Sequence, residues 1–140
     1  AEVPANITSY SFNDLEPRTF YKYQVKAYRI VDGEKVIIMT SKVVHSIFNG
    51  KTYADPLRVT LDMTSLNLAV GEDTVLTGNV VLQKDKKLKA HTKVIRYESS
   101  NNEIATVNNM GEVTTKAVGT CYIYAYAQNG VYKKIKVTVE

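Results

Sequence analysis

Hydrophobic and polar residues alternate along most of this chain. Such a period of two is typical of strands that bury one face. The alternating apolar positions are Tyr21, Tyr23, Val25 and Ala27; Leu66, Leu68 and Val70; and Leu76, Gly78, Val80 and Leu82. Turn residues separate these runs, at Asp32-Gly33, Asn49-Gly50, Gly71 to Asp73, Asn108 to Gly111 and Asn129-Gly130. No helical stripe interrupts them, and the pattern predicts an all-β protein built as one or two sandwiches.

One stretch breaks the alternation. Residues 49–56, NGKTYADP, combine a turn pair, small residues and a proline. This composition is typical of a linker. We therefore expect a first region at 1–48, a linker at 49–56 and a second domain at 57–140.

Composition narrows the classes of partner. The 140 residues carry a net charge of +4, ten tyrosines, no tryptophan and one cysteine. Basic and acidic residues are mixed except between Lys84 and Arg96, so no nucleic-acid partner is expected. No apolar run approaches the roughly 18 residues of a membrane span, so no membrane insertion is expected in this segment. A single cysteine excludes an internal disulfide, and Ala1 is expected to begin a mature or excised piece.

The second region resembles a known family. TSLNLAVGE, YESSNNEIATVNNMGEVTTKAVGTCYIYAYA and the final KKIKVTV are similar, in order and spacing, to the bacterial immunoglobulin-like domain of group 2. The resemblance implies an immunoglobulin-like β-sandwich from a bacterial or phage surface protein. The family usually has Trp where this chain has Tyr97, so we expect a buried Tyr97 ring whose hydroxyl needs a partner. The matching positions are Leu66, Leu68, Val70, Gly71, Ser99, Ser100, Asn101, Ala105, Val107, Gly111, Val113, Gly119 and Thr120.

The first region, through LEPRTFYKYQVKA, resembles the C-terminal part of a fibronectin type III domain. The resemblance implies that the Tyr21 hydroxyl anchors a corner. It also implies three strands of a seven-stranded sandwich: ITSYSFNDL (7–15), FYKYQVKAYRI (20–30) and EKVIIMTSKVVHSIF (34–48). Their absent neighbours would have covered Tyr23 and Val25. We therefore expect upstream domains in the parent protein, and completion of the half sandwich by an upstream strand, by self-association or by docking on the second domain.

Residues 97–107, YESSNNEIATV, could be read as a catalytic loop or as a turn. A nucleophilic Ser99 or Ser100 would need a base and an oxyanion pocket. The only histidines, His45 and His91, lie in no recognisable motif. Short polar side chains that bond to nearby backbone explain the stretch, and we expect a turn and no catalytic residue.

Two further features suggest chemistry and have simpler explanations. Cys121 alternates with apolar residues, which favours core packing over a role as nucleophile or metal ligand. Glu72 and Asp73 offer too few oxygen ligands for calcium. We therefore expect no metal and no cofactor.

Two groups of residues form the candidate ligand surface. The tyrosine row on one strand could stack on sugar rings or form ordinary cross-strand pairs. The lysines of KDKKLKAHTK could bind an acidic glycan, although solvated loop charges are the favoured explanation. The candidate residues are Tyr122, Tyr124, Tyr126, Lys86, Lys87 and Lys89.

The turn at Asn129-Gly130 fixes which face the tyrosine row occupies. A two-residue turn would place the row with Ile135 and Val137, whereas a three-residue loop aligns Ile123 and Ala125 with them instead. The second arrangement gives one coherent apolar face, so we predict the longer loop or a bulge, with the three tyrosines facing outward or towards a neighbour.

Two functions follow as hypotheses. The leading one is a non-catalytic spacer in a secreted or cell-surface bacterial protein. The alternative is an adhesion or carbohydrate-binding module that contacts a cell-wall glycan, a host glycan or a host protein. An enzyme is the third choice, because no constellation of acids, metal ligands or nucleophile is visible.

Overall fold

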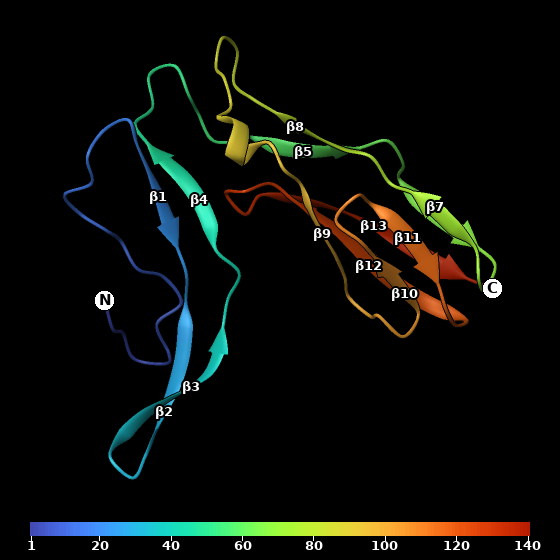
Figure 1. The fold of residues 1–140 in the computed structure, drawn as a ribbon, viewed down its shortest axis with the longest axis horizontal. Helices are drawn as coiled ribbons and strands as arrows, with labels where there is room; N and C mark the ends of the chain where they lie inside the picture. Colours follow the sequence, from blue (N-terminus) through green and yellow to red (C-terminus); the bar gives the residue numbers. More distant parts are fainter.

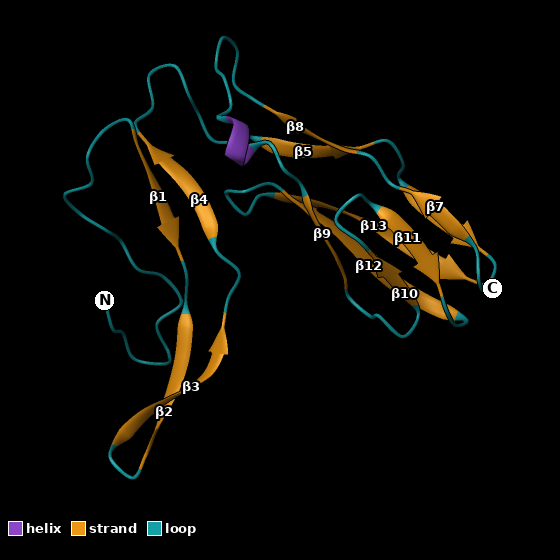
Figure 2. Ribbon diagram, in the orientation of Figure 1, coloured by secondary structure: helices purple, strands orange, loops and turns teal.

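The computed structural model describes residues 1–140, and its regular secondary structure is almost entirely strand (Figures 1 and 2). A C-terminal β-sandwich lies beside a long N-terminal hairpin, and one 3-10 turn, η1 (Ala90–Thr92), lies near the point where they meet. The expected all-β, immunoglobulin-like fold class is confirmed. No helix has the length and apolar character needed to cross a membrane.

The sandwich has two layers. One is a four-stranded sheet in the order β6 (Ser65–Leu68), β13 (Tyr132–Val139), β12 (Gly119–Tyr126) and β9 (Arg96–Ser99), with β6 parallel to β13. The other layer combines β10 (Ala105–Val107), β11 (Glu112–Thr115) and β7 (Asp73–Val75) with the pair β5 (Arg58–Leu61) and β8 (Gly78–Val81).

The core lies between these layers. Nine buried residues form it, among them Leu76, Val113, Ile123 and Ile135. Cys121 is only 2% exposed and belongs to the same cluster, as its position in the alternation predicts. A smaller cluster of Val59, Ala125 and Ala127 continues the core towards η1 and the hairpin.

The β12–β13 hairpin has the predicted register. Its loop consists of residues 128–130, closed by the hydrogen bond from Ala127 N–H to Val131 O (2.8 Å). Ile123 therefore lies opposite Ile135, and Cys121 opposite Val137. The apolar residues share the inner face, and the tyrosine row of β12 lies on the outer face.

The N-terminal region is a long hairpin with a break in each arm (Figure 1). β1 (Thr19–Tyr23) pairs with β4 (Val44–Phe48), and β2 (Lys26–Val31) pairs with β3 (Glu34–Thr40). Between the two pairs, Ser41 N–H donates to the Val25 carbonyl (2.8 Å), but Val25 N–H donates to the Ser41 hydroxyl (2.9 Å) instead of to a backbone carbonyl. The predicted continuous strands at 20–30 and 34–48 are each split there.

One prediction for this region is wrong. Residues 7–15 form no strand, because no other strand in residues 1–140 pairs with them. Their aromatic side chains pack instead: Tyr10 meets Phe12 edge to face, and Phe12 lies 5.4 Å from Tyr23 between ring centroids. Val25 is 72% exposed because no second layer covers this part of the hairpin.

Candidate functional site

The outer face of the four-stranded sheet carries the tyrosine row. Because the register pairs Tyr126 with Tyr132 and Tyr124 with Lys134, two residues of β13 join the row. Tyr124 and Tyr126 are nearly parallel, with ring planes 11° apart and centroids 5.8 Å apart. Tyr132 contacts both, at 5.5 and 5.3 Å between centroids. The result is a compact aromatic cluster.

Cations of the same sheet already cover several of these rings. The Lys134 Nζ lies 4.5 Å from the Tyr122 centroid and 5.5 Å from that of Tyr124. The Arg96 guanidinium lies 4.8 Å from the Tyr126 centroid. Burial raises the pKa of the Tyr126 phenol, so it stays protonated at neutral pH. These cross-strand and cation–π contacts stabilise the sheet, and they leave less aromatic face for a sugar ring.

The lysines of the candidate surface lie with the 49–56 segment and contact none of these tyrosines. Lys86 Nζ donates to the Lys51 carbonyl (2.6 Å), and Lys87 forms an isolated parallel bridge with Tyr53. Lys89 Nζ lies 4.3 Å from the Tyr53 ring centroid. The structure therefore divides the predicted surface into two places and supplies Lys134 and Arg96 as the cations of the tyrosine face.

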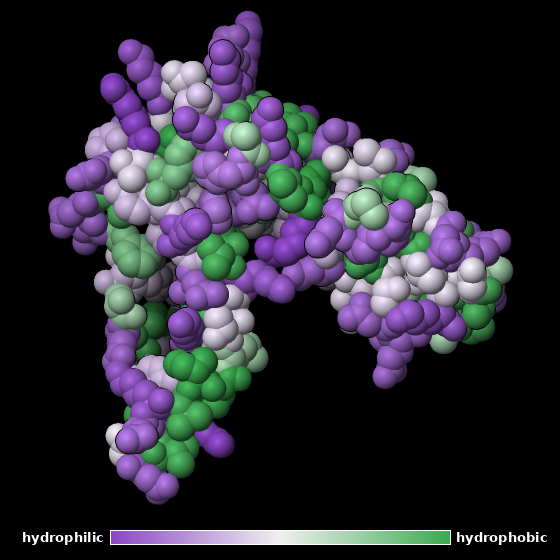
Figure 3. Space-filling model, in the orientation of Figure 1, coloured by the Kyte–Doolittle hydropathy of each residue, from purple (hydrophilic) through white to green (hydrophobic).

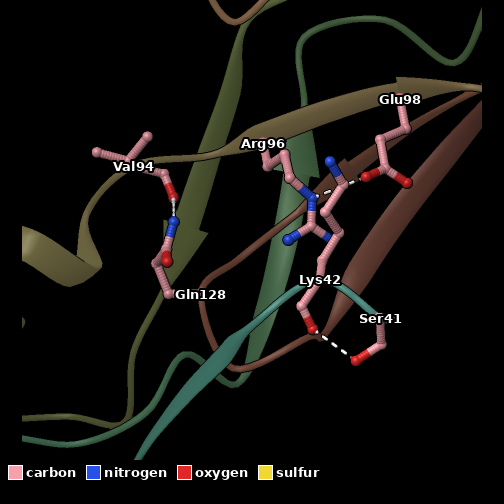
Figure 4. Close-up of polar contacts among 6 residues, drawn as sticks. All are labelled: Ser41, Lys42, Val94, Arg96, Glu98 and Gln128. Atoms are coloured by element: carbon pink, nitrogen blue, oxygen red, sulfur yellow. Dashed lines mark hydrogen bonds and ion pairs between the residues drawn. The ribbon is translucent and has the colours of Figure 1, made fainter. Parts of the chain in front are cut away.

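The hairpin and the sandwich meet at a junction of direct contacts. His45 N–H in β4 donates to the Gln128 carbonyl (2.6 Å) in the β12–β13 loop. In that loop, the Asn129 side-chain NH2 donates to the Pro56 carbonyl (2.9 Å). Figure 4 shows how the loop is held from its other side, where the Gln128 amide donates to the Val94 carbonyl (3.0 Å). The bond to Pro56 thus fixes the C-terminal end of the 49–56 segment to the β12–β13 loop.

Aromatic rings complete the junction. Phe20 of β1 meets His91 of η1 edge to face, with centroids 5.3 Å apart. His45 lies 5.6 Å from His91 by the same measure. Asp55 fixes the neighbouring part of β4, accepting hydrogen bonds from the Ser46 hydroxyl (2.5 Å) and from Ile47 N–H (3.0 Å).

Below the junction, an open groove of about 1450 Å³ runs along the hairpin and the segment before it and reaches the sandwich at Arg96, Glu98, Tyr126 and Gly130. Figure 3 shows that the molecule is hollowed between its two arms. Tyr23 and Tyr28 line it on the hairpin side. Tyr126 and the ion pair of Arg96 Nε with Glu98 (3.0 Å) line it on the sandwich side, and the Lys42 side chain points towards that pair (Figure 4). The groove is aromatic on both sides.

The residues first weighed as catalytic or metal-binding have structural contacts. The Ser99 hydroxyl accepts from Asn101 N–H (3.2 Å), and the Ser100 hydroxyl accepts from Tyr122 N–H (2.9 Å), as expected of a turn. Glu72 accepts from Ala69 N–H (2.9 Å). No three histidine, cysteine, aspartate or glutamate residues are grouped so as to hold a metal ion.

Comparisons with known proteins assign the sandwich. A family model described as bacterial Ig-like domain (group 2) matches residues 58–139, more than half of the chain. The chain belongs to the family of bacterial Ig-like domains of group 2. The match includes none of residues 1–57, and a search of curated proteins found no match.

Solved structures similar to this Ig-like protein come from an S-layer protein. The crystal structure of SbsC domains 4 and 5 has 17% identity and a TM-score of 0.51, covering 86% of this chain and 75% of that one. The structure of rSbsC(31-844) has 18% identity and a TM-score of 0.49, and this chain spans 20% of its length. The first likeness shows a shared fold that extends beyond residues 58–139 into the N-terminal part.

Tyr97 is the position where this Ig-like domain departs from its family's usual Trp. Its ring packs against both core clusters, and its hydroxyl accepts a hydrogen bond from Gly78 N–H (2.8 Å). Burial raises the pKa of the Tyr97 phenol, which therefore stays a neutral acceptor. The partner that the sequence required is a backbone amide of β8.

The sequence alone did not identify several residues of the Ig-like domain's outer face and of the junction. Tyr132 and Lys134 could have been found, because the predicted loop length already places them opposite Tyr126 and Tyr124. His45 and Asn129 carried no such signal. Their contacts depend on how the hairpin docks, which no local pattern encodes.

Proposed function

We propose that this chain is a non-catalytic spacer of a secreted or surface-attached bacterial protein. In this role two β-units joined end to end hold another domain away from the cell. Membership in the bacterial Ig-like family supports the surface location, and the fold likeness to two consecutive S-layer protein domains supports a structural role.

The junction is the observation that carries the proposal. A spacer must keep its two ends at a fixed distance and orientation. A flexible linker between the units cannot do this. Here the 128–130 loop bonds to His45 on the hairpin and to Pro56 before the sandwich (2.6 and 2.9 Å). The first bond crosses the boundary between the two units, and the second fixes the end of the 49–56 linker to the sandwich. Together they restrict the relative rotation of the units.

We further propose that residues 1–48 are the last part of a fibronectin type III-like sandwich. The Tyr21 hydroxyl accepts from Glu16 N–H (2.7 Å) five residues upstream, the contact of a tyrosine corner. The β2–β3 pair also leaves large apolar side chains exposed, including Ile38 (58%) and Met39 (70%). Upstream strands of the parent protein would cover them, since a two-stranded hairpin is only marginally stable alone.

Small-angle scattering of residues 1–140 at pH 7.5 tests the spacer. We expect one compact distance distribution that matches the docked arrangement. Asn129→Ala removes the bond to Pro56 and should broaden the distribution, whereas Asn102→Ala, an exposed turn residue, should leave it unchanged. A wild-type chain whose two units move independently would contradict the proposal.

The second candidate function is adhesion or glycan binding. The aromatic groove favours it, because Tyr23, Tyr28 and Tyr126 line one open space beside Lys42 and Arg96. A glycan array with residues 1–140 separates the two functions. The spacer predicts no saturable binding, while binding that is lost in Tyr28→Ala, with an unchanged melting temperature, would favour recognition in the groove.

A further inference from the structure

The chain's two histidines meet across the junction. His45 lies on β4 of the hairpin and His91 on η1 of the sandwich, with ring centroids 5.6 Å apart and planes 46° apart. The sequence contains no other histidine. The chain's only imidazoles therefore lie next to each other where the two units touch. Imidazole is the side chain whose unperturbed charge change falls between about pH 5 and 8.

The surroundings of this pair are basic. Lys22 lies directly opposite His45 in the β1–β4 register. Lys89 and Lys93 flank η1 on either side of His91. The acid that contacts β4, Asp55, is already engaged by the Ser46 hydroxyl and Ile47 N–H. The 128–130 loop faces His45 with a neutral carbonyl and carries no charged side chain.

The same residue closes the junction through its backbone. His45 N–H makes the 2.6 Å bond to Gln128 O, so β4 carries both this donor and the imidazole. His91 in turn packs on Phe20, which ties the opposite strand of the hairpin to η1. Repulsion between the two imidazoles would act directly on the ring contacts at η1, and it would reach the backbone bond only through a movement of β4.

We propose that this junction is a pH-sensitive joint: it is closed while His45 and His91 are neutral and opens when both are protonated. The proposal rests on the docked spacer described above. Two like charges at this separation repel, and no free carboxylate lies in contact to compensate them.

The pKa shift of His45 determines whether the junction opens at low or at high pH. Burial lowers the pKa of His45, and Lys22 and His91 lower it further. His45 is therefore harder to protonate in the closed state than in the open state. The closed state is fully populated above the ordinary imidazole pKa of about 6.5, and it loses population as the pH falls below that value. In that window the ratio of closed to open molecules should fall about tenfold per pH unit for each proton taken up.

The test uses residues 1–140 between pH 7.5 and 5.5 with a chelator present. Scattering should show a larger maximum dimension at pH 5.5, and NMR should show loss of the Phe20–His91 contact while the amides of the sandwich core stay dispersed. The variant His45→Gln/His91→Gln has no imidazole and should keep the same dimension at both pH values. Each single variant keeps only one imidazole and cannot form the pair of like charges, so it should open less at pH 5.5 than the wild-type chain.

Three outcomes would overturn the joint: no opening at pH 5.5, opening of the double variant by acid to the same extent, or opening only together with unfolding of the sandwich. A chain that is already open at pH 7.5 would contradict the spacer itself. A chain that is closed at both pH values would contradict only the pH-sensitive joint.

Discussion

Replacing Tyr97 should separate two contributions to the stability of the Ig-like domain. The ring packs on both core clusters, so Tyr97→Ala should cost about 3–5 kcal/mol of unfolding free energy, the range for removing a large core aromatic. Tyr97→Phe keeps the ring and removes only the acceptor for Gly78 N–H. An amide left without a partner costs about 1–3 kcal/mol, and we expect the lower end because Tyr97 is only half-buried.

Tyr97→Trp tests the family resemblance against the structure. The family's usual residue would suggest that Trp is tolerated, but an indole N–H is a donor and cannot accept from Gly78 N–H. The site is also narrow: a Cβ on Gly78 would lie 2.9 Å from the Tyr97 hydroxyl, and one on Gly111 would lie 3.2 Å from the ring. We therefore expect Trp to cost about 1–3 kcal/mol, from overpacking and the lost bond.

Urea unfolding of residues 1–140, followed by the amide signals of the sandwich, measures these differences. Hydrogen exchange at Gly78 reports the bond itself and should be faster in Tyr97→Phe. If Tyr97→Ala costs less than about 1 kcal/mol, Tyr97 is not the core aromatic of the domain. If Tyr97→Phe leaves both stability and Gly78 exchange unchanged, the hydroxyl bond makes no net contribution.

Three further predictions concern other parts of the chain. Residues 57–140 should unfold cooperatively without the hairpin, and collapsed amide dispersion in that fragment would contradict a self-sufficient sandwich. The neutral form of His45 should stabilise the fold fully above about pH 6.5, and this contribution should disappear as the pH falls through the lowered pKa of the folded state, as an NMR titration of the ring would show. Cys121 is buried and burial raises the pKa of its thiol, so a thiol reagent should label it only after unfolding; rapid labelling of the folded chain would show that the core opens there.

Local patterns were sufficient to predict the sandwich. Alternation around Ile123, together with the requirement for one coherent apolar face, predicted both the 128–130 loop and the outward tyrosines. The need of a buried phenol for a partner predicted a hydrogen bond at Tyr97, although not that Gly78 would supply it. These inferences succeed because the strands concerned are completed by neighbours within the same domain.

The N-terminal region shows where such reasoning fails. The fibronectin resemblance assigned residues 7–15 to a strand, and the alternation placed Val25 among the apolar positions of a half-buried face. A strand at 7–15 and a cover for Val25 both need neighbouring strands that residues 1–140 do not contain. A strand needs a partner for its backbone groups, and a face is buried only if something covers it. The contacts of the lysines near Tyr53 were not predicted, for a related reason: packing of the 49–56 segment decides them.

The tyrosine face and the core are linked through one short strand. β9 is an edge strand of the four-stranded sheet; its Arg96 covers Tyr126 on the outside, and its Tyr97 packs on the core clusters. Removing the Tyr126 ring should therefore loosen β9 and weaken the Tyr97–Gly78 bond on the opposite face. The costs of Tyr126→Ala and Tyr97→Phe should then not add, because residues that share a strand are coupled. A Tyr126 variant could therefore lose ligand binding only because β9 has loosened. Tyr126 would be identified as a ligand contact if binding were lost while the hydrogen exchange of the Gly78 amide stayed unchanged.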